Sequence, residues 1–486
     1  MERLVRRVPS TLSESDHPYL NGAWTPNFDE YDAEEMEVIG EIPADLDGIY
    51  VRNTENPVHD AIGKYHPFDG DGMLHMMRFS GGKASYKNRF IRTRGFEAEQ
   101  EAGRSLWIGF TGNPQKSERP GWGAHGYVKD SSSTDVLVHA GQILSTFWQC
   151  GEGYRLDPES LDTLGIEGWT PDDGISAHPK VDPKTGELLF FNYSLKAPYM
   201  HYGVVGADNQ LKHYIPVELP GGRLPHDMAF SENFSILNDF PLFWAPEALE
   251  NGYYVPVYKP ELKSRFAILP RYGQPADIRW FEADPTYVLH YTNCYEEGDE
   301  IVLDGYFQNA PWPEPNERFD PKYRLLAAGI DYHSFKPHLH RWRFNLKTGE
   351  TREEPLYKDH YVEFGTINPQ YLMRKNRYVY SATAEPDWFL FNGLIKHDLE
   401  TGATQRLHFG DKRFGSEAPF IPRKGATEED DGYLVSFITD MNTDRSECVV
   451  LDARDIERGP LCRIFLPHRI CSGTHAVWAG ADELSA

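Results

Sequence analysis

The stretch RWRFNLKTGETREEPLY (residues 341–357) contains the local unit on which the fold depends. A β-like run ends at an Asn, a turn containing Gly follows, and a second run begins after the turn. Two further stretches repeat this order, VDPKTGELLFFNY (181–193) and IKHDLETGATQRLHF (395–409). Asp, Asn and Gly tolerate the left-handed backbone of tight turns, so each stretch is predicted to form a β-hairpin.

Looser versions of this unit extend the pattern, in YRLDPESLDTLG (154–165) and VVLDARDIERGPLCRIFL (449–466). The units at 341–357, 395–409 and 449–466 begin about one blade length apart, given the ~40–50 residues of typical propeller blades. Long helical periodicity is scarce, and a single sandwich would not need this much chain. We therefore expect an all-β propeller. Two or three separate β domains remain the alternative on pattern alone.

The composition is that of a globular protein with enough apolar residues for a core. Of 486 residues, 40% are hydrophobic and 25% charged, and 13% aromatics favour strands. No composition break marks a linker, so residues 1–486 are expected to form one domain. The net charge of −25 repels phosphate backbones and anionic headgroups, which makes nucleic acid a poor partner.

Several features bear on location. The start, MERLVRRVPSTLSESD, lacks the apolar region of a signal peptide, and the five cysteines include no CxxC pair. A reducing cytoplasm is therefore expected. The segment FSILNDFPLFWAPEAL (234–249) is apolar and interrupted by proline. It predicts peripheral membrane contact through Phe243 and Trp244, with a buried loop as the alternative.

Common catalytic motifs are missing from the sequence. There is no GxSxG elbow, Walker A loop or HExxH helix. GWGAHG (121–126) has dinucleotide-site spacing, but no strand precedes it and no helix follows. FDGDGM (68–73) is acidic but lacks the later ligands of an EF-hand, so we expect a tight turn there.

Four of the 19 histidines lie beside apolar, strand-like runs. Their wide spacing suits a site at the axis of a radial fold, where each blade contributes one ligand. The alternative is that they are ordinary core or loop histidines. The four are His178 in ISAHPKVDP, His226 in GGRLPHDMAFSEN, His290 in TYVLHYTN and His475 in CSGTHAVW.

At these residues the sequence resembles the carotenoid cleavage oxygenases, a family that includes apocarotenoid and stilbene oxygenases and a retinoid isomerase. The resemblance covers nearly the whole chain, and its strength lies in the order of many short motifs. These run from YLNGAWTPNFDEY, VIGEIPADLDGIYVRNTENP and YHPFDGDGMLH through SAHPK, PHDMAFSEN, VLHYTN and EFGTIN to SEAPFIPR, EEDDGYLVSF and SGTHAVW.

The resemblance implies a seven-bladed β-propeller with a dome of loops and short helices over one Fe(II) per chain. It implies that the four histidines named above are the iron ligands. It also implies that Glu363 in VEFGTIN and Glu417 in GSEAPF hydrogen-bond the far nitrogens of ligating histidines. A third such glutamate is expected near residue 148, but STFWQCGEG is one residue longer than the family pattern and has Trp148 or Gln149 there. Glu152 is a candidate substitute.

The implied reaction is cleavage of a conjugated carbon–carbon double bond by O2, which gives two carbonyl products and needs no NADH or flavin. In the stilbene- and phenylpropene-cleaving branch, a lysine and a tyrosine bind the substrate phenol. Their places correspond here to Phe147 or Trp148 and to Phe110, which favours a carotenoid or apocarotenoid. Thr134 corresponds to a small residue beside the iron.

Three other readings remain open. A stilbene oxygenase would need another phenol-binding residue, such as Tyr127 or Lys129. A polyene isomerase would use the same metal site without consuming O2. A non-catalytic propeller module would bind less than one metal ion per chain. The expected partners are a small apolar conjugated substrate and O2, without an obligate protein partner.

Overall fold

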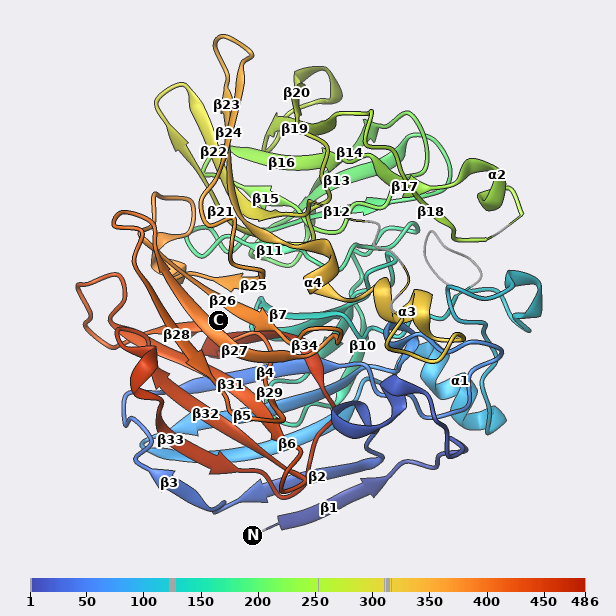
Figure 1. Ribbon diagram of the computed structural model, residues 1–486, viewed down its shortest axis with the longest axis vertical. Helices are drawn as coiled ribbons and strands as arrows, with labels where there is room; N and C mark the ends of the chain where they lie inside the picture. The colour runs from blue at the N-terminus through green and yellow to red at the C-terminus, as the bar shows by residue number, and fades with distance from the viewer. Residues whose placement is uncertain are drawn as a thin grey trace. The chain divides into compact units, whose positions relative to one another are not determined.

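A computed structural model describes residues 2–121, 128–251, 253–309, 311, 315 and 317–485 (Figure 1). Within this part of the chain, strands form seven sheets of four or six strands, together with one two-stranded sheet. Adjacent strands pair antiparallel, as in the blades of a seven-bladed β-propeller. The all-β propeller predicted from the sequence is confirmed.

The chain divides into two compact units, Met1–Ala177 with Leu407–Ala486 and His178–Arg406. The expectation that residues 1–486 form one domain stays a prediction.

The first unit contains three of the seven blades. Its first blade has the order β1-β2-β6-β5-β4-β34, so strands from both ends of the chain share one sheet. The second blade has the order β10-β9-β8-β7, and the third has β29-β31-β32-β33-β3 with β30 beside β31. The strands are β1 (Glu2–Arg7), β2 (Asp29–Glu34), β3 (Val38–Gly40), β4 (Gly48–Thr54), β5 (Met73–Ser80), β6 (Lys83–Phe90), β7 (Asp135–His139), β8 (Gln142–Thr146), β9 (Tyr154–Leu156), β10 (Thr163–Ile166), β29 (Arg413–Phe414), β30 (Phe420–Pro422), β31 (Gly432–Asp440), β32 (Arg445–Asp452), β33 (Pro460–Phe465) and β34 (Gly473–Gly480).

The second unit contains four blades and the two-stranded sheet β17-β18. Three blades, β11 to β14, β21 to β24 and β25 to β28, follow sequence order, and one has the order β15-β16-β19-β20. The strands are β11 (Lys180–Val181), β12 (Leu188–Tyr193), β13 (Tyr199–Val205), β14 (Leu211–Glu218), β15 (Ala229–Phe230), β16 (Phe234–Asp239), β17 (Leu242–Trp244), β18 (Pro256–Tyr258), β19 (Ser264–Pro270), β20 (Arg279–Ala283), β21 (Tyr291–Glu297), β22 (Glu300–Phe307), β23 (His338–Asn345), β24 (Thr351–Pro355), β25 (Val362–Thr366), β26 (Tyr378–Ala384), β27 (Phe391–Asp398) and β28 (Thr404–His408).

Short helices occupy the connections between strands, in line with the predicted loops and short helices (Figure 1). In the described ranges, none is long and apolar enough to cross a membrane. The helices are α1 (Arg94–Ala102), α2 (Pro246–Leu249), α3 (Arg324–Ala328), α4 (Tyr332–Phe335) and the 3-10 turns η1 (Pro18–Leu20), η2 (Gly22–Trp24), η3 (Pro67–Asp69), η4 (Pro114–Lys116), η5 (Pro275–Asp277), η6 (Pro369–Tyr371), η7 (Ile456–Arg458) and η8 (Glu483–Ser485).

The predicted hairpin turns are confirmed. Between β23 and β24, the N–H of Gly349 donates to the carbonyl of Asn345 at 2.9 Å, and Gly349 has a φ of 81°. The side chain of Asn345 accepts from the N–H of Thr348 at 2.8 Å. Gly402 and Asp398 repeat this arrangement between β27 and β28. Glycine is favoured at both turns because a side chain at such a φ is strained.

The segment predicted to contact a membrane is buried in the second unit at its two key positions. Phe243 is 7% exposed and lies under the guanidinium of Arg223, and Trp244 is 2% exposed and packs on Tyr254. The buried alternative therefore describes both side chains. Membrane contact by other residues stays a prediction.

Candidate metal centre

Three of the four predicted histidines meet in the second unit. His178, His226 and His290 each precede the first strand of a different blade, namely β11, β15 and β21. Their ligand nitrogens lie within 4.8 Å of one another, and the Nε2 atoms of His178 and His226 are 3.0 Å apart. Nitrogen atoms this close to one another can bind one cation together. The cluster could therefore hold a metal ion.

A buried carboxylate orients His290. Its Nδ1–H donates to Oε2 of Glu363 at 2.6 Å, and Glu363 is 1% exposed. The same oxygen accepts from the N–H of Phe364 at 2.8 Å. A carboxylate that holds the proton on Nδ1 leaves Nε2 with a free lone pair for a metal. This is the arrangement expected for Glu363.

A β-bulge places Glu363 at this position. The register between β25 and β26 shifts between Glu363 and Thr366, and Phe364 has a φ of 53°. Bulges often re-aim a side chain beside an active site. The ring of Phe364 then packs 4.8 Å from that of His290 and 6.3 Å from that of Tyr332 in α4. Within this unit the short helix α4 thus packs on the phenylalanine that contacts His290.

The fourth histidine, His475, lies on β34 in the first unit with a similar carboxylate partner. Its Nδ1 is 3.3 Å from Oε2 of Glu417, which also accepts from the N–H of Ala476 at 2.9 Å. Burial lowers the pKa of His475, but the carboxylates of Asp135 and Glu417 outweigh burial, so the pKa is raised. The predicted pairing of Glu417 with His475 is therefore present.

The position expected for a third glutamate is different. Gln149 is 2% exposed, and neither atom of its side-chain amide has a hydrogen-bond partner among the described residues. Glu152, the candidate substitute, forms an ion pair with Arg94 and accepts from the hydroxyl of Tyr154 at 2.9 Å. Glu152 is thus engaged elsewhere in the first unit.

The predicted pocket residues converge on Trp148 in the first unit. The ring of Phe110 lies 5.0 Å from that of Trp148, and the ring of Phe147 lies 6.3 Å away. The hydroxyl of Thr134 accepts from the backbone N–H of Trp148 at 3.1 Å. Phe68 also packs on Trp148, at 6.3 Å. The group is aromatic and apolar, and its correspondence to the phenol-binding lysine and tyrosine of the stilbene-cleaving branch stays a prediction.

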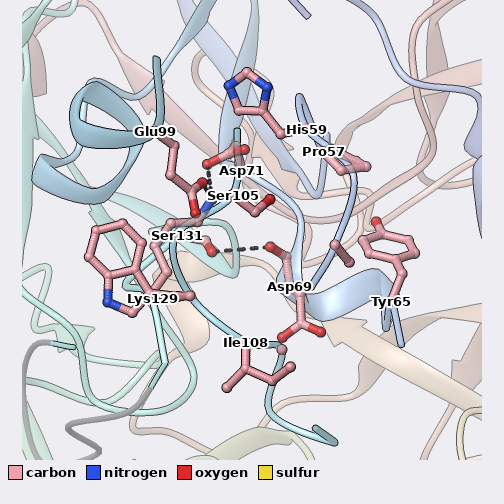
Figure 2. Close-up of a pocket in the computed structure, with 13 residues that line it drawn as sticks. Pro57, His59, Tyr65, Asp69, Asp71, Glu99, Ser105, Ile108, Lys129 and Ser131 are labelled. Atoms are coloured by element: carbon pink, nitrogen blue, oxygen red, sulfur yellow. Dashed lines mark hydrogen bonds and ion pairs between the residues drawn. The ribbon is translucent and has the colours of Figure 1, made fainter. Parts of the chain in front are cut away.

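Lys129 lies in a small polar cavity of about 40 Å³ in the first unit (Figure 2). Its Nζ is 2.7 Å from Oδ1 of Asp71 and 2.6 Å from Oε2 of Glu99. Burial lowers the pKa of Lys129, but these two carboxylates outweigh it and raise the pKa. The positive charge of Lys129 is therefore already balanced by two buried carboxyl groups. Tyr127, and residues 122–126 of the GWGAHG motif, lie outside the described residues.

FDGDGM (68–73) is a turn, as expected. It begins inside η3 and ends where β5 starts. Asp69 accepts from the N–H groups of Phe110 and His66, at 3.1 and 3.2 Å.

Sequence reasoning missed Asp227 and Phe68. Asp227 directly follows His226, and an acidic residue next to a predicted ligand was the available signal. Phe68 lies within the YHPFDGDGMLH motif, whose acidic residues are the more obvious candidates for a site.

Comparisons with known proteins identify the family of the chain. The family model described as retinal pigment epithelial membrane protein matches residues 24–480. The chain is 34% identical to carotenoid 9,10(9′,10′)-cleavage dioxygenase 1 of Pisum sativum, over 97% of this chain and 92% of that protein. It is 31% identical to isoeugenol monooxygenase of Pseudomonas nitroreducens, over 96% and 98%.

Solved structures match over nearly the whole chain at lower sequence identity. Lignostilbene dioxygenase of Pseudomonas brassicacearum matches with a TM-score of 0.84 and 27% identity, over 97% of this chain and 100% of that one. A mutant of Synechocystis apocarotenoid oxygenase matches with a TM-score of 0.82 and 26% identity, over 94% and 98%. The predicted family and enzyme class, an oxygenase, are confirmed: the chain belongs to the carotenoid cleavage oxygenase family.

Proposed function

We propose that this protein is an Fe(II)-dependent dioxygenase that uses O2 to split a conjugated carbon–carbon double bond of a carotenoid or apocarotenoid into two carbonyl products. The observation that carries the proposal is the meeting of His178, His226 and His290, with His290 oriented by Glu363. The relatives named as dioxygenases support the reaction class.

In this proposal His475 supplies the fourth nitrogen, and one iron binds per chain. Its support is the resemblance to the family and the repeated pairing of a histidine Nδ1 with a glutamate, His475 with Glu417 and His290 with Glu363. Imidazole suits iron as a ligand, although affinity alone does not select iron over other divalent metals. Bound iron would activate O2 at the coordination positions that four imidazoles leave open.

The protein's own contribution is to hold the substrate in an apolar, water-poor site. A conjugated double bond supplies the electrons for its own cleavage, so positioning is the main task of the side chains. The aromatic group around Trp148, with Phe110, Phe147 and Phe68, suits an apolar polyene. Thr134, bound to the backbone of Trp148, is proposed to lie beside the iron.

A phenol substrate is the second candidate, because one relative is named isoeugenol monooxygenase and a solved neighbour is named lignostilbene dioxygenase. Ionising a para-hydroxyl calls for a nearby base or cation. Phe110 and Trp148 provide neither, and Lys129 is held between Asp71 and Glu99. These observations favour the polyene.

Product analysis tests the proposal. The iron-loaded protein is incubated under ¹⁸O2 with an apocarotenal and, in a separate reaction, with a 4-hydroxystilbene, and the products are identified by mass spectrometry. Two carbonyl products that carry the label are expected. Geometric isomers formed equally well without O2 would instead indicate the isomerase. Cleavage of a 4-hydroxystilbene alone would indicate the phenol-cleaving activity.

The place of the protein in the cell is also proposed to be the cytoplasm, with or without peripheral membrane contact. No disulfide joins its five cysteines, all of which are among the described residues, as a reducing compartment would favour. Flotation with neutral liposomes would show whether the protein binds lipid surfaces.

A further inference from the structure

The three converging histidines lie outside the strands of their blades. His178, His226 and His290 occupy irregular segments that end where β11, β15 and β21 begin. Among the described residues, strand β22 holds one of them at a single point, where the N–H of Tyr306 donates to the carbonyl of His290 at 3.2 Å. Other contacts have to fix the three segments relative to one another, because a metal site tolerates only small errors in ligand position.

One buried carboxylate contacts a residue within or directly after each of the three segments. Asp227 is 1% exposed and follows His226 directly. Its Oδ2 accepts from the N–H of Tyr291, the residue after His290, at 2.9 Å. Its Oδ1 accepts from the N–H of Met228 at 2.7 Å and lies 2.7 Å from Nζ of Lys180, two residues after His178. Among the described residues, the hydrogen bonds and the ion pair of this carboxylate all go to residues within two positions of a histidine.

We propose that Asp227 is a positioning residue whose carboxylate fixes the segments that carry His178, His226 and His290, and thereby sets the affinity and geometry of the metal site. The inference rests on the proposed metal-binding function of these histidines. Asp227 acts through residues that neighbour the histidines in the chain. Its hydrogen bonds go to the backbone N–H groups of Tyr291 and Met228 and not to the ligand nitrogens.

The Asp227→Asn substitution separates this role from simple packing. Asparagine has nearly the same size, but only one of its two terminal atoms can accept a hydrogen bond. If the side-chain oxygen of the asparagine keeps the contacts with Met228 and Lys180, its NH2 group faces the N–H of Tyr291. Two hydrogen-bond donors then oppose each other. The link from the segment of His226 to that of His290 is lost, while the volume of the side chain is kept.

Asp304→Asn is the matched control. Asp304 is 0% exposed and lies on β22 of the same unit. Its two oxygens accept from Nε and a terminal nitrogen of Arg341, both at 2.7 Å. The same chemical change is therefore made at a buried ion pair that holds neighbouring strands instead of the histidine segments.

The test loads wild type and both variants with Co(II), then records the visible absorption of the bound metal and its rate of release to a chelator. Thermal unfolding is measured in parallel on the metal-free proteins. For Asp227→Asn we expect release at least about tenfold faster, the lower end of the effect of losing a supporting contact at a metal site, and an altered absorption spectrum. Asp304→Asn should lower the unfolding temperature but keep the wild-type spectrum and release rate.

Lys180→Gln provides a second variant if Asp227→Asn does not fold. The side chain of Lys180 is 28% exposed, so its replacement costs less stability. It removes the link to the segment of His178 only, and we expect a smaller shift in the same direction. The proposal would be overturned if Asp227→Asn kept the release rate and the spectrum of the wild type. Lys180→Gln takes its place in this comparison if Asp227→Asn does not fold. Equal effects in Asp304→Asn would overturn it as well.

The Co(II) measurements use no substrate, which keeps the two proposals apart. Wild-type protein that binds Co(II) but consumes no O2 when loaded with iron would overturn the proposed dioxygenase alone. Wild-type protein that binds no Co(II) would overturn the positioning role of Asp227 together with the metal site.

Discussion

The Nε2 atoms of His178 and His226 lie 3.0 Å apart, although the two residues are separated by 48 positions in the chain. Each precedes the first strand of a different blade, β11 or β15. Two neutral imidazoles that face each other at this distance can share one proton or converge on one cation. The second possibility is favoured because the ligand nitrogen of His290 lies within 4.8 Å of both.

Metal addition should stabilise the folded protein through this cluster. With free metal at roughly 100 times its Kd, the expected gain in unfolding free energy is about 2.7 kcal/mol. His226→Ala should lose most of this gain in a thermal unfolding measurement. His213→Ala is the control, because His213 lies in the same unit and binds the carbonyl of Gly273. An equal gain in wild type and His226→Ala would contradict the assignment.

Glu363→Gln should weaken metal binding by about 10- to 100-fold, the usual cost of removing the partner of a ligating histidine. The amide still fits, but it no longer holds the proton on Nδ1 of His290 through a charged contact of 2.6 Å. The measurement is a competition with a chelator of known affinity.

A matched control exists for Glu363→Gln. In the second unit, Glu353 lies 3.2 Å from Nε2 of His340, which is not part of the predicted ligand set. Glu353→Gln should leave metal affinity unchanged. Loss of affinity in both variants would indicate a general effect of removing charge.

Trp148→Ala should raise the KM for an apocarotenal by about tenfold or more while metal content stays at the wild-type level. The indole is the ring on which Phe110, Phe147 and Phe68 all pack, so its loss opens the aromatic group. Stability should fall by about 3–5 kcal/mol, as for other buried aromatic truncations.

Trp169→Ala controls for that loss of stability, since both tryptophans are 8% exposed. It should destabilise the protein without changing the KM. A KM that rises equally in both variants, or in neither, would remove Trp148 from the substrate site.

The contribution of Asp130 to stability should fall between about pH 4 and pH 7. Burial raises the pKa of this carboxyl from 3.8 to about 7. A carboxyl with a raised pKa in the folded protein stabilises it fully below the unfolded pKa, and this contribution is lost as pH rises through the folded value. Asp130→Asn should therefore flatten the dependence of the unfolding temperature on pH over this window.

Asp157→Asn should have the opposite effect. Burial raises the pKa of Asp157, but the N–H groups of Ser160 and Glu159 outweigh burial, so the pKa is lowered from 3.8. Its contribution is present at higher pH and is lost as pH falls through the lowered value. The assignment for Asp130 would be wrong if both variants changed the profile in the same direction.

The repeated turns and the histidines were accessible from the sequence because their signals are local. Asn345 and Gly349 fix a turn through neighbouring backbone groups, so a few letters suffice to predict it. His178, His226 and His290 stand beside apolar runs that become the first strands of blades. Their convergence follows once those strands are arranged as a propeller.

Other features depend on contacts that no local pattern encodes. The left-handed backbone of Phe364 and the bulge there place Glu363 against His290, yet the sequence EFGTIN contains no local pattern that predicts a bulge. Asp227 reaches Tyr291 across 64 positions, and β34 pairs with β4 across most of the chain. Such pairings are set by tertiary packing, which overrides local preference.

The most direct test of the central claim is O2 uptake by the iron-loaded protein, measured side by side with an apocarotenal and a 4-hydroxystilbene, with His226→Ala as the blank. We expect uptake with the apocarotenal only, and none in the blank. Uptake with the 4-hydroxystilbene only would contradict the polyene substrate, and uptake undiminished in His226→Ala would contradict the metal site itself.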